Sequence, residues 1–281
     1  MNPHIGLIVT GAEAAREFGI FTKSLELWHP DATLYVYTDS ATDLSKIAFK
    51  GTLHIKKALD AYKGLTRKTM EALPGKTHDS LFKEYTYEKA AVLEWMFESQ
   101  PALKTTGAWF CDADITFCAP LPPIPESATL ALSPHYIREV DCKLYGKYNA
   151  GFFWMKDPAH ITTWRAAAAT SRFFEQAALE AVAAAAGTAL YEFPIQVNFG
   201  WWRMYQAAAA PPAIQAKFSF FRGDTSVGIR YDGAPLQSIH THWHDTSRSA
   251  AGVFNAWYNE FTKKFASHKP LAAQRKLLNL K

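Results

Sequence analysis

The first 40 residues constrain the fold of this chain more than any other part of the sequence. A compact apolar run at 5–10 predicts a buried strand, and large apolar residues then recur every three or four positions through residue 28, which is the period of a helix. A second apolar strand is expected at 33–37. Strand, helix and strand in this order form a βαβ unit, which implies a right-handed crossover and a mostly parallel sheet.

Polar residues follow both strands of this unit, at the ends where parallel sheets bind ligands. Thr10 and Gly11 come directly after the first strand, and Thr38 and Asp39 come after the second. We expect these residues either at a ligand site or in ordinary turns at strand ends.

The rest of the chain continues the α/β pattern. A polar, basic segment at 64–80 predicts a mobile loop, and a helix is expected at 85–99. Further strands are expected at 108–111, 130–133, 152–155 and 236–243, and helices within 158–186. Alanine runs at 166–169, 183–186 and 207–210 favour helices. A basic amphipathic tail ends the sequence.

Composition narrows the class of protein. With 281 residues, 48% of them hydrophobic, the chain can bury a large core, and a net charge of +4 does not predict nucleic acid as a partner. The three cysteines form no CxxC pair, so we expect neither a disulfide framework nor a thiolate zinc site. This cysteine pattern predicts a reducing compartment. We also expect a cytoplasmic location, because no apolar run approaches the roughly 18 residues of a membrane helix.

An acidic pair, Asp112 and Asp114, directly follows the apolar strand expected at 108–111. Carboxylates at a strand end need a cation or hydrogen-bond donors, and they suit Mg²⁺ or Mn²⁺, which also bind substrate phosphates. A solvated turn is the simpler interpretation of the pair when it is taken alone.

Three segments together resemble nucleotide-sugar-dependent glycosyltransferases with the GT-A fold, most closely those of family 8. CDADITF at 111–117 resembles the DxD motif of these enzymes, and YNAGFFWMKDP at 148–158 resembles their sugar-lining segment. LQSIHTHWHD at 236–245 lies where many members carry a metal-binding histidine. The resemblance implies an α/β, Rossmann-like fold with a mixed, mostly parallel sheet flanked by helices. It implies one domain, 1–281, with a nucleotide-binding half at 1–118 and an acceptor-binding half at 119–281.

The resemblance also implies a reaction, in which a hexose passes from a nucleotide sugar, with UDP the favoured carrier, to a hydroxyl of a glycan or glycolipid-type acceptor. Mn²⁺ or Mg²⁺ would be held by Asp112 and Asp114 with His240 or His242, and the histidine pattern leaves His244 open as well. The residues expected to bind the donor are Thr10, Gly11, Thr38, Asp39, Lys89, Asp112, Asp114, Asn149, Gly151 and Asn198.

Glu192 is a candidate catalytic base, and its segment, YEFPIQVNFGWW, resembles a donor-sugar stretch of the retaining enzymes. Gln196 and Asn198 would contact the sugar there. The aspartates that flank this stretch in the family are missing, so the choice between retention and inversion of the anomeric configuration stays open.

Three alternatives remain. Asp112 to Thr116 also fits the DxDx[TV] signature of haloacid-dehalogenase-type phosphatases, with Asp112 as the nucleophile. A non-enzymatic carbohydrate-binding module would bind sugar without metal or nucleotide. The basic C-terminal tail is either a terminal helix packed by one face or a membrane-surface helix, which would make the protein peripherally membrane-associated.

Overall fold

The fold is described from a computed structural model, for residues 2–206 and 211–280. A seven-stranded sheet lies at its centre, and every strand except β7 runs in the same direction. This confirms the expected α/β class with a mixed, mostly parallel sheet. In spatial order the strands are β3 (Thr52–Lys57), β2 (Thr33–Thr38), β1 (His4–Val9), β4 (Ala108–Cys111), β7 (Tyr148–Met155), β6 (Leu130–Pro134) and β8 (Leu190–Glu192).

The N-terminal βαβ unit forms as predicted. β1 pairs in parallel with β2, with Ile5 opposite Leu34, and α1 (Gly11–Glu26) connects the two strands. Gly11 has a φ of +82°, a conformation that glycine adopts without strain. Thr10 makes no side-chain cap hydrogen bond, so the first turn of α1 is open at the carboxyl end of β1.

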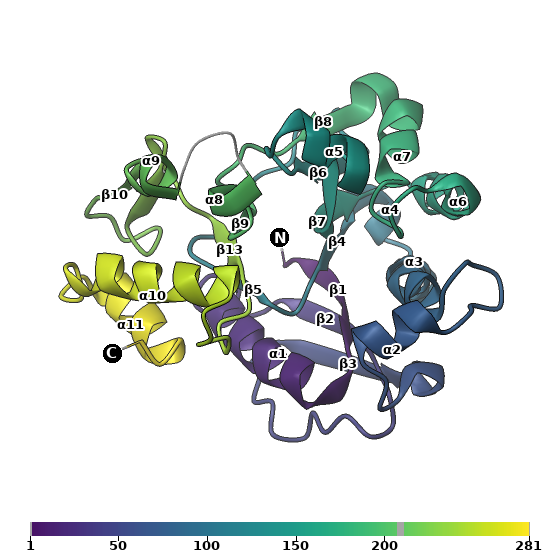
Figure 1. Cartoon of the computed structure of the whole chain (residues 1–281), viewed down its shortest axis with the longest axis horizontal. Coiled ribbons are helices and arrows are strands. Elements are labelled where there is room, and N and C mark those ends of the chain that lie inside the picture. The colour runs from purple at the N-terminus through teal and green to yellow at the C-terminus, as the bar shows by residue number, and fades with distance from the viewer. Residues whose placement is uncertain (1, 207–210, 281) are drawn as a thin grey trace.

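Helices cover both faces of the central sheet (Figure 1). On one face, apolar residues that include Trp164 pack against alternate strand residues such as Phe110. On the other face, α1 contributes Phe21 to a cluster that contains Trp109. The helices of the first face are α3 (Leu81–Ser99), α6 (Ala159–Ala167) and α7 (Leu179–Ala186).

The second half adds two small sheets and two C-terminal helices. The helices α10 (Ala250–Lys263) and α11 (Lys269–Leu277) bury Tyr258 and Leu271 in a third apolar cluster, and α11 contacts α1 (Figure 1). The apolar face of the tail is therefore packed inside the protein. The strands are β5 (Ile115–Phe117), β13 (Ser238–His240) and β9 (Phe199–Gly200) in one sheet, and β10 (Phe218–Phe220), β11 (Ile229–Tyr231) and β12 (Ala234–Pro235) in the other.

The remaining helices are short and connect these elements. They are α2 (Arg67–Ala72), α4 (Leu103–Thr106), α5 (Glu139–Tyr145), α8 (Arg203–Gln206) and α9 (Pro211–Gln215), with 3₁₀ turns η1 (Asp60–Tyr62), η2 (Ala168–Thr170) and η3 (Gly187–Ala189).

Several predicted boundaries are wrong. The segment 64–80 contains α2, because Thr66 caps a helix by accepting from Thr69 N, and α3 begins at Leu81 after the cap Ser80. β7 extends back to Tyr148, well before the predicted start at 152. β13 ends at His240 and not near 243, because the chain turns there.

Two of the alanine runs, 166–169 and 183–186, lie in helices or directly follow them, whereas 207–210 lies outside the described residues. Among residues 2–206 and 211–280, no helix has both the length and the apolar character that a bilayer crossing requires.

Candidate functional site

A cavity of about 700 Å³ opens at the carboxyl ends of β1 and β4, where the parallel sheet predicts a ligand site. Residues from both halves of the chain line it. The β1–α1 turn contributes Thr10 and Gly11, the β4–β5 turn contributes Asp112 and Asp114, and the end of β13 contributes His240.

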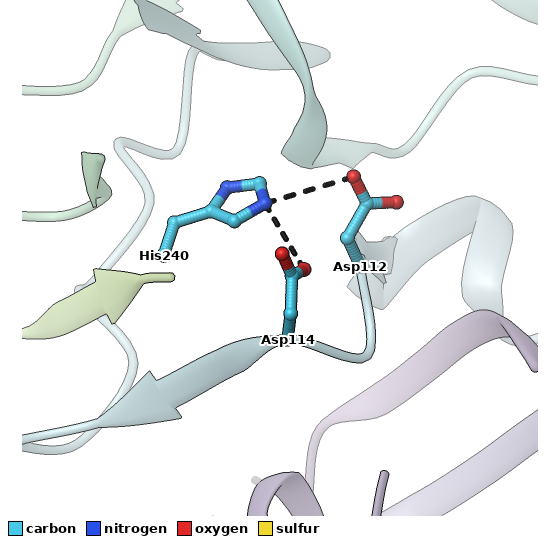
Figure 2. A group of neighbouring side chains, drawn as sticks. All are labelled: Asp112, Asp114 and His240. Carbon is cyan, nitrogen blue, oxygen red and sulfur yellow. Dashed lines mark ion pairs between the residues drawn. The ribbon is translucent and has the colours of Figure 1, made fainter. Parts of the chain in front are cut away.

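Asp112, Asp114 and His240 point toward one another in this cavity (Figure 2). His240 Nε2 lies 3.1 Å from Asp114 Oδ1 and 3.8 Å from Asp112 Oδ2. One ligand atom from each residue lies within 4.8 Å of the others. His242 Nδ1 lies 3.3 Å from Asp114 Oδ2, but its side chain is 54% exposed.

Strand pairing brings these residues together across about 125 positions of sequence. β13 runs antiparallel to β5, which places His240 opposite Ile115, and Thr241 N donates to Asp114 O at 3.2 Å. Asp112 N donates to Gly151 O of β7 at 2.7 Å. The two carboxylates are therefore fixed by backbone on both sides.

Gly151 faces the cluster directly. A Cβ atom at this position would overlap Asp112 Oδ2 and would lie 2.5 Å from His240 Cε1. Only glycine leaves room for the carboxylate and the imidazole to meet above this strand.

The charges of the cluster alter the pKa values of its members. Burial raises the pKa of Asp112, although the charges of Lys89 and His240 oppose this. Burial also tends to raise the pKa of Asp114. His240 and His242 outweigh this effect and hold the pKa of Asp114 well below its usual range. Burial opposes protonation of His240, yet the carboxylates of Asp114 and Asp112 raise its pKa.

This donor set fits a divalent cation. Two carboxylates and an imidazole are ligands that Mn²⁺ accepts, and Mg²⁺ is commonly held by one or two carboxylates with water and phosphate. Asp112 and Asp114 are 31% and 13% exposed at their side chains, so they are open to the cavity, whereas His240 is buried behind them. The cluster suggests a cation site and does not select the ion.

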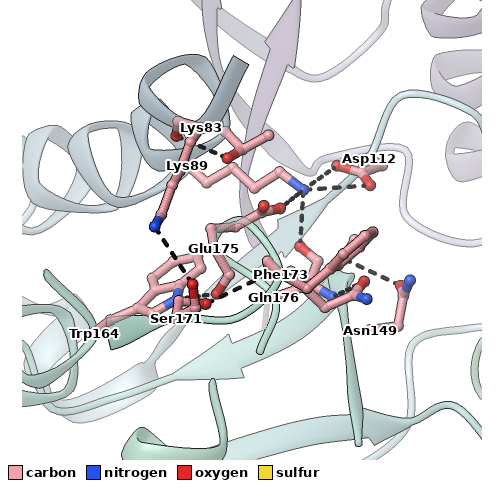
Figure 3. Close-up of polar contacts among 12 residues, drawn as sticks. Lys83, Lys89, Asp112, Asn149, Trp164, Ser171, Phe173, Glu175 and Gln176 are labelled. Carbon is pink, nitrogen blue, oxygen red and sulfur yellow. Dashed lines mark hydrogen bonds and ion pairs between the residues drawn. The ribbon is translucent and has the colours of Figure 1, made fainter. Parts of the chain in front are cut away.

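Lys89, on α3, is held by two carboxylates (Figure 3). Its Nζ lies 3.1 Å from Asp112 Oδ1 and 2.9 Å from Glu175 Oε1, and it donates to Ala150 O at 3.2 Å. Burial disfavours its charge, but Asp112 and Glu175 outweigh this and raise the pKa of Lys89. Lys89 therefore fixes Asp112 and lines the cavity beside it.

The residues predicted to bind the donor at the ends of β1 and β2 differ in position: the pair after β1 lines the cavity, and the pair at β2 does not. Thr10 and Gly11 line it, and Thr10 Oγ1 hydrogen-bonds Tyr85 OH at 2.9 Å. Asp39 accepts from Thr42 Oγ1 at 2.6 Å, and Thr42 in turn accepts from Gly11 N. Thr38 is buried beside Asp39 and, like it, does not line the cavity.

Asn149 and Asn198 are buried and are not part of the cavity lining. Asn149 Oδ1 accepts from Gly151 N at 3.1 Å and from Asn198 Nδ2 at 3.0 Å. The geometry gives these amides a role in positioning β7, and contact with a donor sugar stays a prediction.

The two predicted catalytic residues are also outside the cavity lining. Glu192 is bonded to Lys147 Nζ at 2.7 Å and to Tyr148 OH at 2.6 Å, and Gln196 Nε2 donates to Tyr231 O at 2.8 Å. Both side chains have structural partners here, and a catalytic role for either stays a prediction.

Sequence reasoning missed one wall of the cavity. The irregular segment 171–176 supplies Phe173, Phe174 and Glu175, and Arg67 of α2 stacks on Phe174 at 5.7 Å from its centroid. No local pattern marks this segment. Glu17, on the buried face of α1, also lines the cavity, and its sequence signal is a carboxylate on an apolar helix face.

Comparison with known proteins identifies the fold. The sequence matches no family model and no curated protein. Its structure resembles the galactosyltransferase LgtC, solved with donor and acceptor sugar analogs, with a TM-score of 0.52 and 14% identity over 92% of this chain and 95% of LgtC. The chain has the GT-A fold. The DxD segment therefore lies in the fold that its resemblance implied.

A second similar structure is the apo form of the glycosyltransferase GlyE from Streptococcus pneumoniae TIGR4. It matches with a TM-score of 0.57 and 13% identity, covering 99% of this chain and 62% of GlyE. The chain thus spans about three fifths of GlyE. The named similar structures give no support to a phosphatase, and in this fold Asp112 follows β4 instead of the first strand.

Proposed function

We propose that this protein is a metal-dependent glycosyltransferase that moves a hexose from a nucleoside diphosphate sugar, with UDP favoured, to a hydroxyl of a glycan or glycolipid-type acceptor. One observation carries the proposal. On a GT-A fold, Asp112, Asp114 and His240 converge in the cavity at the carboxyl end of β4, with ligand atoms within 4.8 Å of one another.

The chain's own residues suit the diphosphate end of such a donor. Asp112, Asp114 and His240, with His242 beside them, would hold Mn²⁺ or Mg²⁺, and a cation bound there supplies electrostatic stabilisation of the departing diphosphate. The first turn of α1 also lines the cavity. Thr42 accepts from Gly11 N, but the N-cap residue Thr10 makes no side-chain cap hydrogen bond, and helix N-termini favour anions.

The wall at 173–176 is our candidate for contacts beyond the diphosphate. Phe174 offers an aromatic face, and Arg67 stacks against it. Aromatic faces pack well against the apolar faces of sugars. We keep the division into a nucleotide-binding half, 1–118, and an acceptor-binding half, 119–281, as part of the proposal.

A cytoplasmic location and a peripheral membrane contact through the basic tail also remain proposals. Leu271 of α11 is buried, so any such contact would use the basic surface of the tail and not its apolar face.

Thermal melting tests the function directly, because a ligand that binds only the folded protein raises its melting temperature. UDP, GDP and CMP are added one at a time with Mn²⁺ and with EDTA. We expect a shift with UDP that requires Mn²⁺, followed by sugar release from a UDP-sugar in the same buffer. If no nucleotide shifts the melting temperature with Mn²⁺ present, the proposal is wrong.

A further inference from the structure

Glu17 is a charged residue in an apolar position. It lies in the second turn of α1, on the buried side of the helix with Phe21 and Leu25, and only 3% of it is exposed. Its neighbours in the cavity lining include Asp114 and His242. The side chain thus lies at the edge of the proposed cation site.

Both carboxylate oxygens of Glu17 are buried and neither has a hydrogen-bond partner. Burial raises the pKa of Glu17 to about 8, and the charge of Asp114 raises it further. The backbone N–H groups of His244 and Trp243 approach the carboxylate and partly offset this rise. A buried carboxyl group with no countercharge costs stability, because it must either stay ionised in an apolar environment or take up a proton.

The rest of the cavity shows what a structural carboxylate looks like. Glu175 is also buried, but it pairs with Lys89 at 2.9 Å, and Asp112 pairs with the same ammonium. Among the described residues, no cationic side chain pairs with Glu17, so none offsets the cost of burying its carboxyl group. A cation in the cavity would supply the missing partner charge.

We infer that Glu17 is a further carboxyl group of the cation site, which strengthens divalent cation binding and destabilises the protein when no cation is bound. The inference rests on the proposed function, because it requires a cation at Asp112, Asp114 and His240. Glu17 is not part of the three-residue group whose ligand atoms lie within 4.8 Å. A carboxylate outside the direct ligands acts on a metal through its charge.

The test uses Glu17→Gln and Glu17→Met, which remove the charge and keep the length of the side chain. Mn²⁺ binding is measured by titration calorimetry, and the melting temperature is measured in EDTA. We expect the Mn²⁺ dissociation constant to rise about tenfold in both variants. In EDTA both should melt above the wild type, by roughly 2–4 °C, because a buried carboxyl group without a partner is gone.

The matched control is Glu13→Gln, which removes an exposed carboxylate one turn earlier on the same helix and in the same cavity. Solvent screens Glu13, so its loss should change the Mn²⁺ dissociation constant less than twofold. Asp112→Asn serves as the reference for loss of a direct ligand.

The outcomes separate this inference from the proposed function. If the wild type binds no Mn²⁺, both fail. If the wild type binds Mn²⁺, Asp112→Asn abolishes it and both Glu17 variants bind as the wild type does, only the inference on Glu17 is wrong. Lower melting temperatures of both Glu17 variants in EDTA would also overturn it, because they would assign Glu17 a structural role.

Discussion

Two polar clusters contact Gly151, and they are built differently. Asp112, Asp114 and His240 bring charges together beside a cavity. Asn149 and Asn198 form a neutral amide network that bonds to the backbone of Gly151. The charged cluster is suited to a ligand that brings opposite charge, whereas the neutral one holds the strand that carries it.

The electrostatics of the two clusters differ in the same way. Asp112 shares Lys89 with Glu175, so the carboxylates outnumber the ammonium group that neutralises them at the cavity. Beside the neutral cluster, the Arg203 guanidinium donates to three backbone carbonyls, those of Pro134, His135 and Ile195. Four changes test this contrast: three act on cation binding, from the largest expected effect to the smallest, and the fourth acts on stability.

Replacing a direct ligand should have the largest effect. In Asp112→Asn or Asp114→Asn, loss of a carboxylate should reduce Mn²⁺ affinity and sugar transfer by more than about 100-fold while the protein stays folded. Calorimetry and a UDP-sugar transfer assay measure this. Asp232→Asn is the control: it removes a surface ion pair with Lys217 and should change neither Mn²⁺ affinity nor sugar transfer. Metal-dependent transfer at the wild-type rate in either ligand variant would refute the assignment.

Gly151→Ala should act on the boundary between the clusters. The added methyl group would overlap Asp112 Oδ2 and crowd His240, so the two ligands must separate. We expect Mn²⁺ affinity to fall by about 10–100-fold, as when the support of metal ligands is altered. Gly19→Ala is the control, since its nearest neighbour, Ile47 Cδ1, is at an ordinary 3.5 Å. Equal affinities of the two variants would show that Gly151 does not constrain the ligands.

Replacing either member of the Lys89–Glu175 pair should change Mn²⁺ affinity, in opposite directions for the two residues. Glu175→Gln removes a negative charge near the cation site, so Mn²⁺ affinity should fall by about five- to tenfold, whereas Lys89→Met should raise it. The double variant should lie near the wild type, as a double-mutant cycle can measure.

Glu180→Gln, which breaks an exposed pair with Arg172, is the control for Glu175→Gln. A fall in affinity in both Glu175→Gln and Lys89→Met would mean that the pair acts by holding structure and not by its charge.

Acid should destabilise the protein at His135, whose Nε2 lies 3.5 Å from Asn149 Nδ2 of the neutral cluster. Burial and the charge of Arg203 lower the pKa of His135 to about 4, below its ordinary 6.5. The unfolded chain therefore binds more protons than the folded one between these values, and stability falls as the pH drops from 6.5 to 4, by roughly 3 kcal/mol in full.

Urea unfolding at pH 7 and pH 4.5 measures this loss, and His135→Asn should reduce it. An unchanged acid dependence in the variant would show that His135 is not its source. The exposed His242 contacts Asp114 and is unsuitable as a control, whereas His54, on the edge strand β3, is suitable.

Sequence reasoning succeeded where the signal was local. The βαβ unit, the parallel sheet, and the position of Asp112 and Asp114 at a strand end all follow from short-range periodicity. It could not give the partners of a side chain that depend on distant packing. The sequence does not show that Glu192 is bonded to Lys147 and Tyr148, or that Gln196 donates to the Tyr231 carbonyl.

The sequence by itself determined the fold class and the acidic pair, because backbone periodicity and residue type act within a few positions. The tertiary structure decided the rest of the site. It brought His240 to the pair through the β5–β13 register, and it placed Glu175 on Lys89 from an irregular segment. It also left Glu17 buried without a partner. Such contacts join residues far apart in the chain, and their energies depend on burial and distance, which no local pattern records.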